Sequence, residues 1–328
     1  MKFAFISHAD RLVTLNPKWT SKAHCIESWA LCLDADHFSG CSGNEQTWKS
    51  LNNYDVILIN QNTTMHKLTC EIKKNCPHPF LIAVAEGSVS DISAFSSKTL
   101  FTMIQAARSC DLYGILLDWT VPCYAQLTNK PVRWIGLPFY QEFFSSRRLP
   151  LEQKNPKAPI IALQHSPGSG RSGFSSFLIA SKIPGAKLLS PGLQSGSQEF
   201  IDFLGVKNVD HFPYLEWPEY ISKYSHSYFA IHLDTLYTYG RFPLDMAALG
   251  IPTVGSNRNQ TNKILWPELT VDPIKEIPRA QELALQLIND PDFYRGQVAA
   301  GLFALAQFNP DDAKSRLLDI INNLSKPI

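Results

Sequence analysis

Short apolar runs alternate with segments of helical periodicity through the first half of the chain. The runs are apolar at successive positions, which is typical of strands that a parallel sheet buries on both faces. The expected strands are KFAFIS (2–7), DVILIN (55–60), FLIAVA (80–85), LYGILL (112–117) and VRWIGL (132–137). Between them, apolar residues recur at helical spacing over 21–33, 64–74 and 98–110. This alternation predicts a mostly parallel sheet with helices on both faces.

A segment rich in charge and proline, residues 139–159, interrupts this pattern, and the pattern then starts again. The expected strands of the second half are 160–165, 186–190, 209–214, 228–234, 251–256 and 269–272, and the expected helices are 172–182, 196–204, 216–224, 243–249, 278–289, 291–307 and 310–324. We therefore expect an α/β fold of two doubly wound Rossmann-like domains, residues 1–145 and 157–308. Their sheets are expected to face a cleft with their carboxyl ends, where such sheets bind ligands.

Composition narrows the function classes only slightly. The 328 residues carry a net charge of +1, which gives no global attraction to nucleic acid or to an acidic membrane. All 7 cysteines lie in the first 123 residues without a CxxC pair, which argues against zinc and against a disulfide framework. The N-terminal MKFAFISHAD is better explained as a strand than as a signal peptide, and no stretch approaches the length of a membrane-spanning helix. We expect a cytoplasmic protein.

The stretch YGRFPLDMAALGIPTVGSN (239–257) joins a short helix to a strand. Gly240 precedes the expected helix, Gly250 ends it and Pro252 begins the strand. A glycine at the start of a helix lets an anion approach the N–H groups and the partial positive charge of the helix N-terminus. The pattern predicts a phosphate site, and its plainer alternative is an ordinary α/β connection.

This stretch resembles the C-terminal donor segment of GT-B fold glycosyltransferases, particularly the large retaining family with a Glu-x7-Glu motif. Asp245 stands at the position of the second Glu, and Tyr237 falls by spacing at the first. Residues 109–138, 218–234 and 279–324 also resemble segments of that family. The resemblance implies a GT-B fold with an N-terminal acceptor domain, a C-terminal donor domain, and a last helix, 309–328, that crosses back to the N-terminal domain.

The resemblance also implies a nucleotide-diphosphate sugar, with UDP or GDP, as the donor, and a carboxylate at Asp245 that accepts hydrogen bonds from the ribose hydroxyls. Diphosphate calls for cations as well as amides. The loop QHSPGSGRSGF (164–174) occupies the place of the family's basic loop, and Arg241 is the candidate for a missing lysine. The full set of expected donor-binding residues is Gly168, Gly170, Arg171, Pro213, Tyr214, Tyr237, Tyr239, Gly240, Arg241, Phe242 and Asp245. Within this set, we expect Pro213 and Tyr214 to contact the nucleobase. We expect Tyr237 and Tyr239 to contact the sugar.

Candidate catalytic groups follow the strands of the first half. Glu86, His8 and Asp118 each come at or near the end of an expected strand, where a general base or an acceptor ligand could lie. Each has a structural or helix-capping alternative. The Asp-x-Asp of LDADH (33–37) is expected to be a solvated turn, so we expect no metal site and no cofactor beyond the nucleotide-sugar co-substrate.

These features together predict a glycosyltransferase that moves a sugar, with retention and without a metal, to an unknown acceptor. The acceptor classes left open are a glycan, a lipid-linked glycan, a protein and a modified nucleic-acid base. One alternative is a nucleotide-sugar epimerase or hydrolase of the same fold. Another is a noncatalytic nucleotide- or solute-binding protein.

Overall fold

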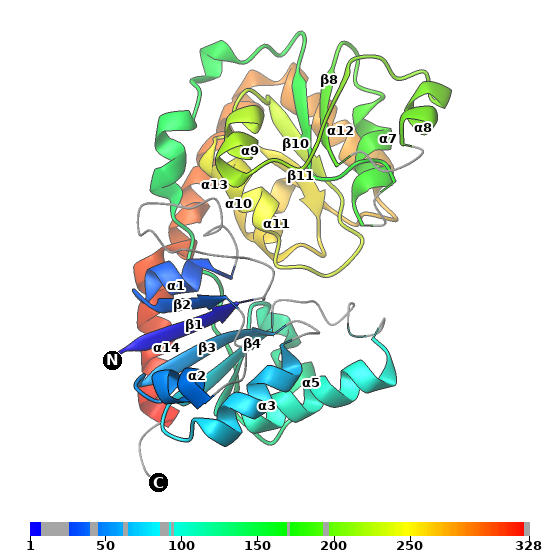
Figure 1. Cartoon of the computed structure of the whole chain (residues 1–328). Helices are drawn as coiled ribbons and strands as arrows, with labels where there is room; N and C mark the ends of the chain where they lie inside the picture. The colour runs from blue at the N-terminus through cyan, green and yellow to red at the C-terminus, as the bar shows by residue number, and fades with distance from the viewer. Residues whose placement is uncertain are drawn as a thin grey trace. The chain divides into compact units, whose positions relative to one another are not determined.

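The computed structural model describes residues 1–7, 26–39, 45–61, 65–85, 92, 95–168, 171–192 and 197–324. The chain folds as two compact units, Met1–Phe139 with Phe308–Ile328, and Tyr140–Gln307. Each unit is built on a six-stranded parallel sheet, shown in Figure 1. The prediction of an α/β fold with two doubly wound parallel-sheet domains is confirmed.

The sheet of the first unit has the strand order β2-β1-β3-β4-β5-β6. Its strands are β1 (Phe3–Ser7), β2 (Asp36–Ser39), β3 (Val56–Gln61), β4 (Phe80–Ala85), β5 (Leu112–Ile115) and β6 (Val132–Trp134). Every residue of β1 and β3 is buried, as expected for strands with helices on both faces. The chain order changes direction between β1 and β3, and open parallel sheets bind ligands at the carboxyl ends of such strands.

The helices of the first unit agree with the prediction only in part. They are α1 (Ser28–Cys32), α2 (Glu45–Leu51), α3 (His66–Asn75), α5 (Ser97–Ser109), α6 (Val121–Ala125) and α14 (Pro310–Leu324). The strand β2 and the helices α2 and α6 were not expected. The segment 33–37 is more than a solvated turn, because Asp34 adopts a left-handed turn conformation and Asp36 begins β2. The Asp36 carboxylate also accepts a hydrogen bond from the Tyr54 hydroxyl.

The C-terminal helix α14 belongs to the first unit, where it packs against α1. The guanidinium of Arg316 donates to the carbonyl of Ile135 and lies 4.2 Å from the centre of the Trp134 ring. From α1, the indole of Trp29 donates to the carbonyl of Gly136. The end of the first domain is thus held by helices from both ends of the chain.

The sheet of the second unit has the order β12-β11-β10-β7-β8-β9. Its strands are β7 (Ile160–Leu163), β8 (Lys187–Pro191), β9 (Val209–Phe212), β10 (Phe229–His232), β11 (Thr253–Ser256) and β12 (Thr270–Val271). Its helices are α7 (Gly173–Ala180), α8 (Ser197–Phe203), α9 (Trp217–Tyr224), α10 (Arg241–Ala248), α11 (Gln260–Leu265), α12 (Ile277–Asn289) and α13 (Pro291–Ala304). No helix in the described part of the chain is long and apolar enough to cross a bilayer.

Helix α10 is buried along nearly its whole length and ends as the sequence predicts. Gly250 has a φ of 66°, its N–H donates to the carbonyl of Ala247, and the N–H of Ile251 donates to Met246. This pair of bonds is a Schellman motif, which requires the left-handed residue that glycine supplies. The remaining carbonyls at this end receive cations. Arg148 Nε donates to the Ala248 carbonyl at 2.9 Å, and Lys154 Nζ lies 3.3 Å from the Gly250 carbonyl.

We predict that Arg148→Ala lowers the free energy of unfolding by about 1–2 kcal/mol, because it removes a charge-assisted bond at the negative end of a buried helix. Arg147→Ala is the matched control. Arg147 is the preceding residue and the last of the 3₁₀ segment Gln141–Arg147. It donates to the carbonyl of Phe143 rather than to α10. Urea denaturation of both variants checks the prediction, and equal losses in the two would contradict it.

Candidate functional site

Two helices begin after neighbouring strands at the carboxyl edge of the second sheet. The strands β7 and β10 are neighbours, and the chain order changes direction between them. Helix α7 follows β7 and helix α10 follows β10, and neither N-cap residue, Ser172 or Gly240, caps its helix with a side chain. The first N–H groups of a helix have no partner within the helix and carry a partial positive charge. This edge therefore offers two helix N-termini at a topological switch point, an arrangement suited to phosphate groups.

Gly240 has a φ of 88° and a ψ of 76°, in the left-handed region. A Cβ atom at this position would lie 2.0 Å from Oδ1 and 2.2 Å from Nδ2 of Asn259. The sequence predicted that this glycine clears space for an anion. The structure shows a further reason for it, because the amide of Asn259 packs directly on the Gly240 backbone.

Arg171 directly precedes Ser172, the N-cap residue of α7, and is held by a buried carboxylate from the loop after β10. Its Nη2 lies 2.6 Å from Oδ2 of Asp234, which is fully buried, while 43% of the Arg171 side chain remains exposed. The other oxygen of Asp234 accepts from the N–H of Leu236, and the Thr235 hydroxyl donates to the Arg171 carbonyl. The loops after β7 and β10 are thus tied together, with part of the guanidinium open to solvent.

Two histidines that the sequence did not single out lie beside this pair. His232, the last residue of β10, has its Nε2 3.7 Å from Oδ2 of Asp234 and its ring packed edge-on against Phe242. The ring of His165 lies 6.3 Å from that of His232. Burial lowers the pKa of each imidazole to about 3, and the charge of Arg171 acts in the same direction, so both rings are neutral near pH 7. Their position at the ends of expected strands was the available signal.

Asp245 lies inside the second unit rather than at its surface. Its side chain is 3% exposed, and Oδ1 accepts a hydrogen bond from Nε of Arg241 at 2.8 Å. Burial raises the pKa of this carboxyl to about 6, although the Arg241 charge and a hydrogen bond from Trp217 lower it. The two predicted donor residues therefore form a buried ion pair on successive turns of α10.

The remaining expected donor residues divide into exposed and buried groups. Pro213 and Tyr214 follow β9 and are exposed, and the Tyr214 ring lies against the backbone of Gly192 at the end of β8. Tyr237 is half-exposed, with the Arg258 guanidinium 5.7 Å from its ring centre. Tyr239 and Phe242 are buried, Gly168 lies in an exposed turn, and Gly170 falls outside the described residues.

Of the three catalytic candidates of the first unit, only Asp118 is among the described residues; His8 and Glu86 lie outside them. Asp118 is exposed at the start of a 3₁₀ turn, Asp118–Thr120, and its carboxylate accepts from the N–H of Trp119. This is the structural role that the sequence left open as an alternative.

The carboxyl ends of β1 and β3 carry polar side chains that were not predicted as site residues. Ser7 ends β1, and its hydroxyl lies 2.8 Å from Nε2 of His37 on β2. Asn60 and Gln61 end β3 and are buried, and Gln61 donates to the Thr69 hydroxyl. Within the apolar strands FAFIS and VILINQ, the polar residues at the carboxyl end were the signal for this group.

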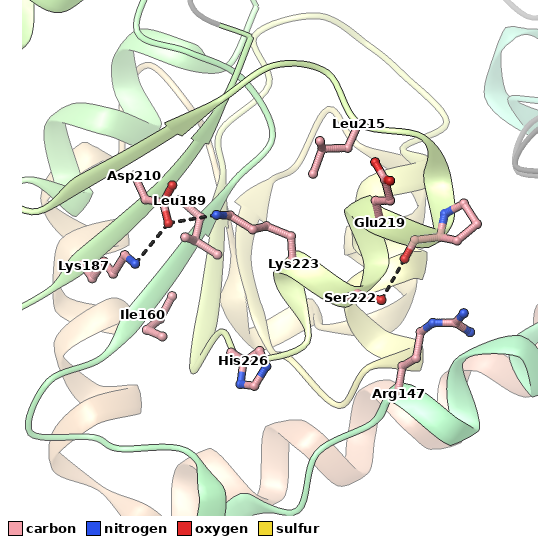
Figure 2. A pocket seen from close by; sticks show the side chains of 11 residues that line it. Arg147, Ile160, Lys187, Leu189, Asp210, Leu215, Glu219, Ser222, Lys223 and His226 are labelled. Atoms are coloured by element: carbon pink, nitrogen blue, oxygen red, sulfur yellow. Dashed lines mark hydrogen bonds and ion pairs between the residues drawn. The ribbon is translucent and has the colours of Figure 1, made fainter.

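The second unit also has a cavity of about 750 Å³ between its sheet and α9, shown in Figure 2. It lies toward the amino ends of the strands, where Ile160 begins β7 and Lys187 begins β8. Lys187 and Lys223 both point at Asp210, with Nζ to Oδ2 distances of 3.0 and 2.9 Å. This cavity therefore lies at the end of the sheet opposite to the carboxyl edge where α7 and α10 begin.

The fold of the chain is similar to those of solved structures that share little sequence with it. Anabaena HepE in complex with UDP and glucose matches with a TM-score of 0.73 and 13% identity, over 98% of this chain and 100% of that one. The chain has the GT-B fold. Sucrose-phosphate synthase from Thermosynechococcus elongatus matches with a TM-score of 0.67 and 14% identity, over 85% and 76% of the two chains. The N-terminal domain of Candida albicans trehalose-6-phosphate phosphatase matches with a TM-score of 0.69 and 11% identity, over 99% and 97%.

Neither protein-family models nor curated protein sequences match the chain. With identities this low, the GT-B likeness defines the fold, and the chemistry has to be argued from the residues of the two carboxyl edges.

We predict that Gly240→Ala destabilises the protein by about 1–3 kcal/mol more than Gly205→Ala, because the added methyl overlaps Asn259. Gly205 is a matched control, since its φ is 65° and a Cβ there would meet nothing within 4 Å. Both variants share the cost of a left-handed alanine, about 1–2 kcal/mol. Thermal or urea unfolding measures the difference, and equal losses would show that Asn259 does not restrict this position.

A second prediction concerns pH. The folded-state pKa of Asp245, about 6, lies above its ordinary value of 3.8, so protonation favours the folded state. This contribution is complete below the unfolded pKa and is lost as pH rises through about 6, a change on the order of 3 kcal/mol. Asp245→Asn lacks this titration. Its unfolding free energy, measured against wild type by urea denaturation, should therefore increase from about pH 4 to about pH 7, whereas parallel pH profiles would contradict the burial of this carboxyl.

Proposed function

We propose that the protein is a glycosyltransferase whose second unit binds a UDP-sugar as donor. The observation that carries the proposal is the pair of helix starts, α7 and α10, at one topological switch point, with Arg171 just before α7 and paired with Asp234 in the loop that leads to α10. The diphosphate accepts hydrogen bonds from the helix N–H groups and from the exposed part of the guanidinium. Similarity in fold to HepE, a structure that contains UDP and glucose, supports the same choice of ligand.

The other donor contacts follow from the second unit. Asp245 is ionised near neutral pH in spite of its burial, because Arg241 lies beside it, and we assign it to the ribose hydroxyls. Tyr214 is 72% exposed, and an exposed aromatic ring suits stacking of a nucleobase. Tyr237 is assigned to a hydroxyl of the transferred sugar.

Transfer breaks the bond between the anomeric carbon and the diphosphate. Arg171 and the helix N-termini stabilise the negative charge that develops on the leaving group, so the mechanism that we propose uses no metal and no cofactor besides the co-substrate. In the retaining reaction that the resemblance implies, an oxygen of the leaving phosphate takes the proton of the acceptor hydroxyl. A cytoplasmic location stays a prediction.

We assign the acceptor to the carboxyl ends of β1 and β3 in the first unit. The hydroxyl of Ser7 and the amides of Asn60 and Gln61 can both donate and accept hydrogen bonds, which suits a hydroxyl-rich acceptor such as a glycan. His8 and Glu86 remain candidates for binding the acceptor, and Asp118 is a weaker one because its carboxylate already accepts from the N–H of Trp119.

One observation favours a second candidate, a nucleotide-sugar epimerase or hydrolase of the same fold. Such an enzyme uses histidines and carboxylates near the sugar, and His165, His232 and Asp234 lie together at the donor edge. The two functions differ in their products. An epimerase or hydrolase converts the UDP-sugar without an acceptor, whereas a transferase releases UDP in proportion to acceptor glycosylated.

The first test is stabilisation by UDP. A ligand that binds only the folded state raises the free energy of unfolding by about 2.7 kcal/mol at 100 times its Kd, and the melting temperature rises with it. We expect UDP and UDP-glucose to stabilise the wild type and to lose this effect in Arg171→Ala. Lys187→Ala is the control, because it removes a cation at the opposite end of the same sheet and should bind UDP like the wild type.

Turnover completes the test. UDP release from UDP-sugars, measured with and without a panel of glycan acceptors, should depend on acceptor and should fall at least about tenfold in Arg171→Ala. If no nucleoside diphosphate stabilises the wild type, or if Lys187→Ala and Arg171→Ala lose stabilisation equally, the donor assignment is wrong.

A further inference from the structure

A row of buried polar side chains connects the start of α10 with Arg171 at the edge that we assign to the diphosphate. We propose that Asn259 is a positioning residue that fixes the start of α10 relative to Arg171, and so sets the diphosphate site. The inference rests on the proposed function. It concerns a residue in the loop after β11 that is fully buried and is not itself expected to touch the donor.

At one end of the row, Asn259 acts on α10. Its Oδ1 accepts from the N–H of Asn262 at 3.0 Å, which fixes the plane of the amide, and Oγ1 of Thr261 lies 3.0 Å from the same oxygen. The amide in this plane fills the space above Gly240, where a Cβ atom would overlap it. The Thr261 hydroxyl in turn donates to the Gly240 carbonyl at 2.5 Å. The backbone at the start of α10 is therefore held by the side chain at 259 and by its neighbour.

At the other end, the row reaches Arg171. Nδ2 of Asn259 lies 3.5 Å from Nδ1 of His232. Donation from the amide to Nδ1 leaves the imidazole proton on Nε2, which faces Oδ2 of Asp234 at 3.7 Å. The same oxygen of Asp234 lies 2.6 Å from Arg171. The polar row is thus Asn259, His232, Asp234 and Arg171, and every member except the arginine is buried.

This row matters because glycine does not define its own backbone conformation. Gly240 can adopt many φ and ψ values, so without a neighbour that fills the space above it, the first N–H groups of α10 would sample a range of directions. A displacement of about 1 Å between amides and a phosphate is enough to weaken the interaction severely. Asn259 removes that freedom, and it fixes the direction of the first N–H groups of α10 relative to Arg171.

The chain provides an internal control on the same helix. Asn262 of α11 is as buried as Asn259, and its amide packs on Gly255 in the same manner, with Cγ 2.3 Å from where a Cβ would lie. Its Nδ2 donates to the Thr270 hydroxyl, near β12. Asn262→Ala therefore creates a comparable buried defect in the neighbouring part of the unit, outside the polar row.

The test measures two quantities in wild type, Asn259→Ala, Asn259→Ser and Asn262→Ala. The first is amide hydrogen exchange in the free protein of residues 240–244, of which Pro243 has no N–H, and the second is the Kd for UDP by calorimetry. Serine retains an oxygen that can cap α11, so Asn259→Ser keeps the experiment informative if the alanine variant folds poorly. We expect both variants at position 259 to exchange these amides at least about tenfold faster and to bind UDP about tenfold more weakly. Asn262→Ala should leave both quantities within about twofold of wild type.

Each outcome bears on a separate claim. Unchanged exchange at 240–244 in the variants at position 259 would overturn the positioning role, whether or not UDP binds. Faster exchange with an unchanged Kd, or an equal loss of affinity in Asn262→Ala, would also overturn it. Failure of the wild type to bind UDP would instead remove the proposed function, and the exchange data would then show only whether Asn259 holds α10.

Discussion

The ion pair between Arg171 and Asp234 is the interaction on which the arrangement of the donor edge depends. A fully buried carboxylate is unfavourable unless a cation and hydrogen-bond donors satisfy it. Asp234 has Arg171 on one oxygen and the Leu236 N–H on the other, and these partners come from the loops after β7 and β10. Burial of this single carboxylate therefore fixes the separation of the two loops from which α7 and α10 begin. A phosphate placed there would bind an arginine that Asp234 already holds in position, so the two anions would share one guanidinium.

Helix α10 shows the same division of roles along its axis. Its C-terminal carbonyls are satisfied by the Schellman motif and by Arg148 and Lys154, two cations from the segment that enters the second unit. Burial and the nearby Arg148 charge lower the pKa of Lys154 to about 8, so this lysine holds its proton at a cost. At the N-terminus, by contrast, the cap residue is a glycine without a side chain. The helix is thus anchored at its negative end, while its positive end points toward the edge where a ligand would bind.

The sequence predicted the elements that long apolar runs and turn residues define. Apart from β2, the strands of both sheets follow from local patterns, as do the glycine that ends α10 and the last helix from Pro310 to Leu324. It missed β2, α2, α6 and α11, since each spans at most 7 residues and is too short to show a clear period. It also missed His232, Asp234 and Asn259. Their roles arise from contacts among loops that are far apart in the sequence, and no spacing rule connects them.

The central claim is that the diphosphate of a nucleotide lies between the starts of α7 and α10 against Arg171. The most direct measurement is a crystal structure of the protein with UDP. The account predicts both phosphates within hydrogen-bond distance of the Arg171 guanidinium and of the first N–H groups of α10. A nucleotide found in the cavity beside α9, or at any site that leaves Arg171 bound to Asp234 alone, would contradict it.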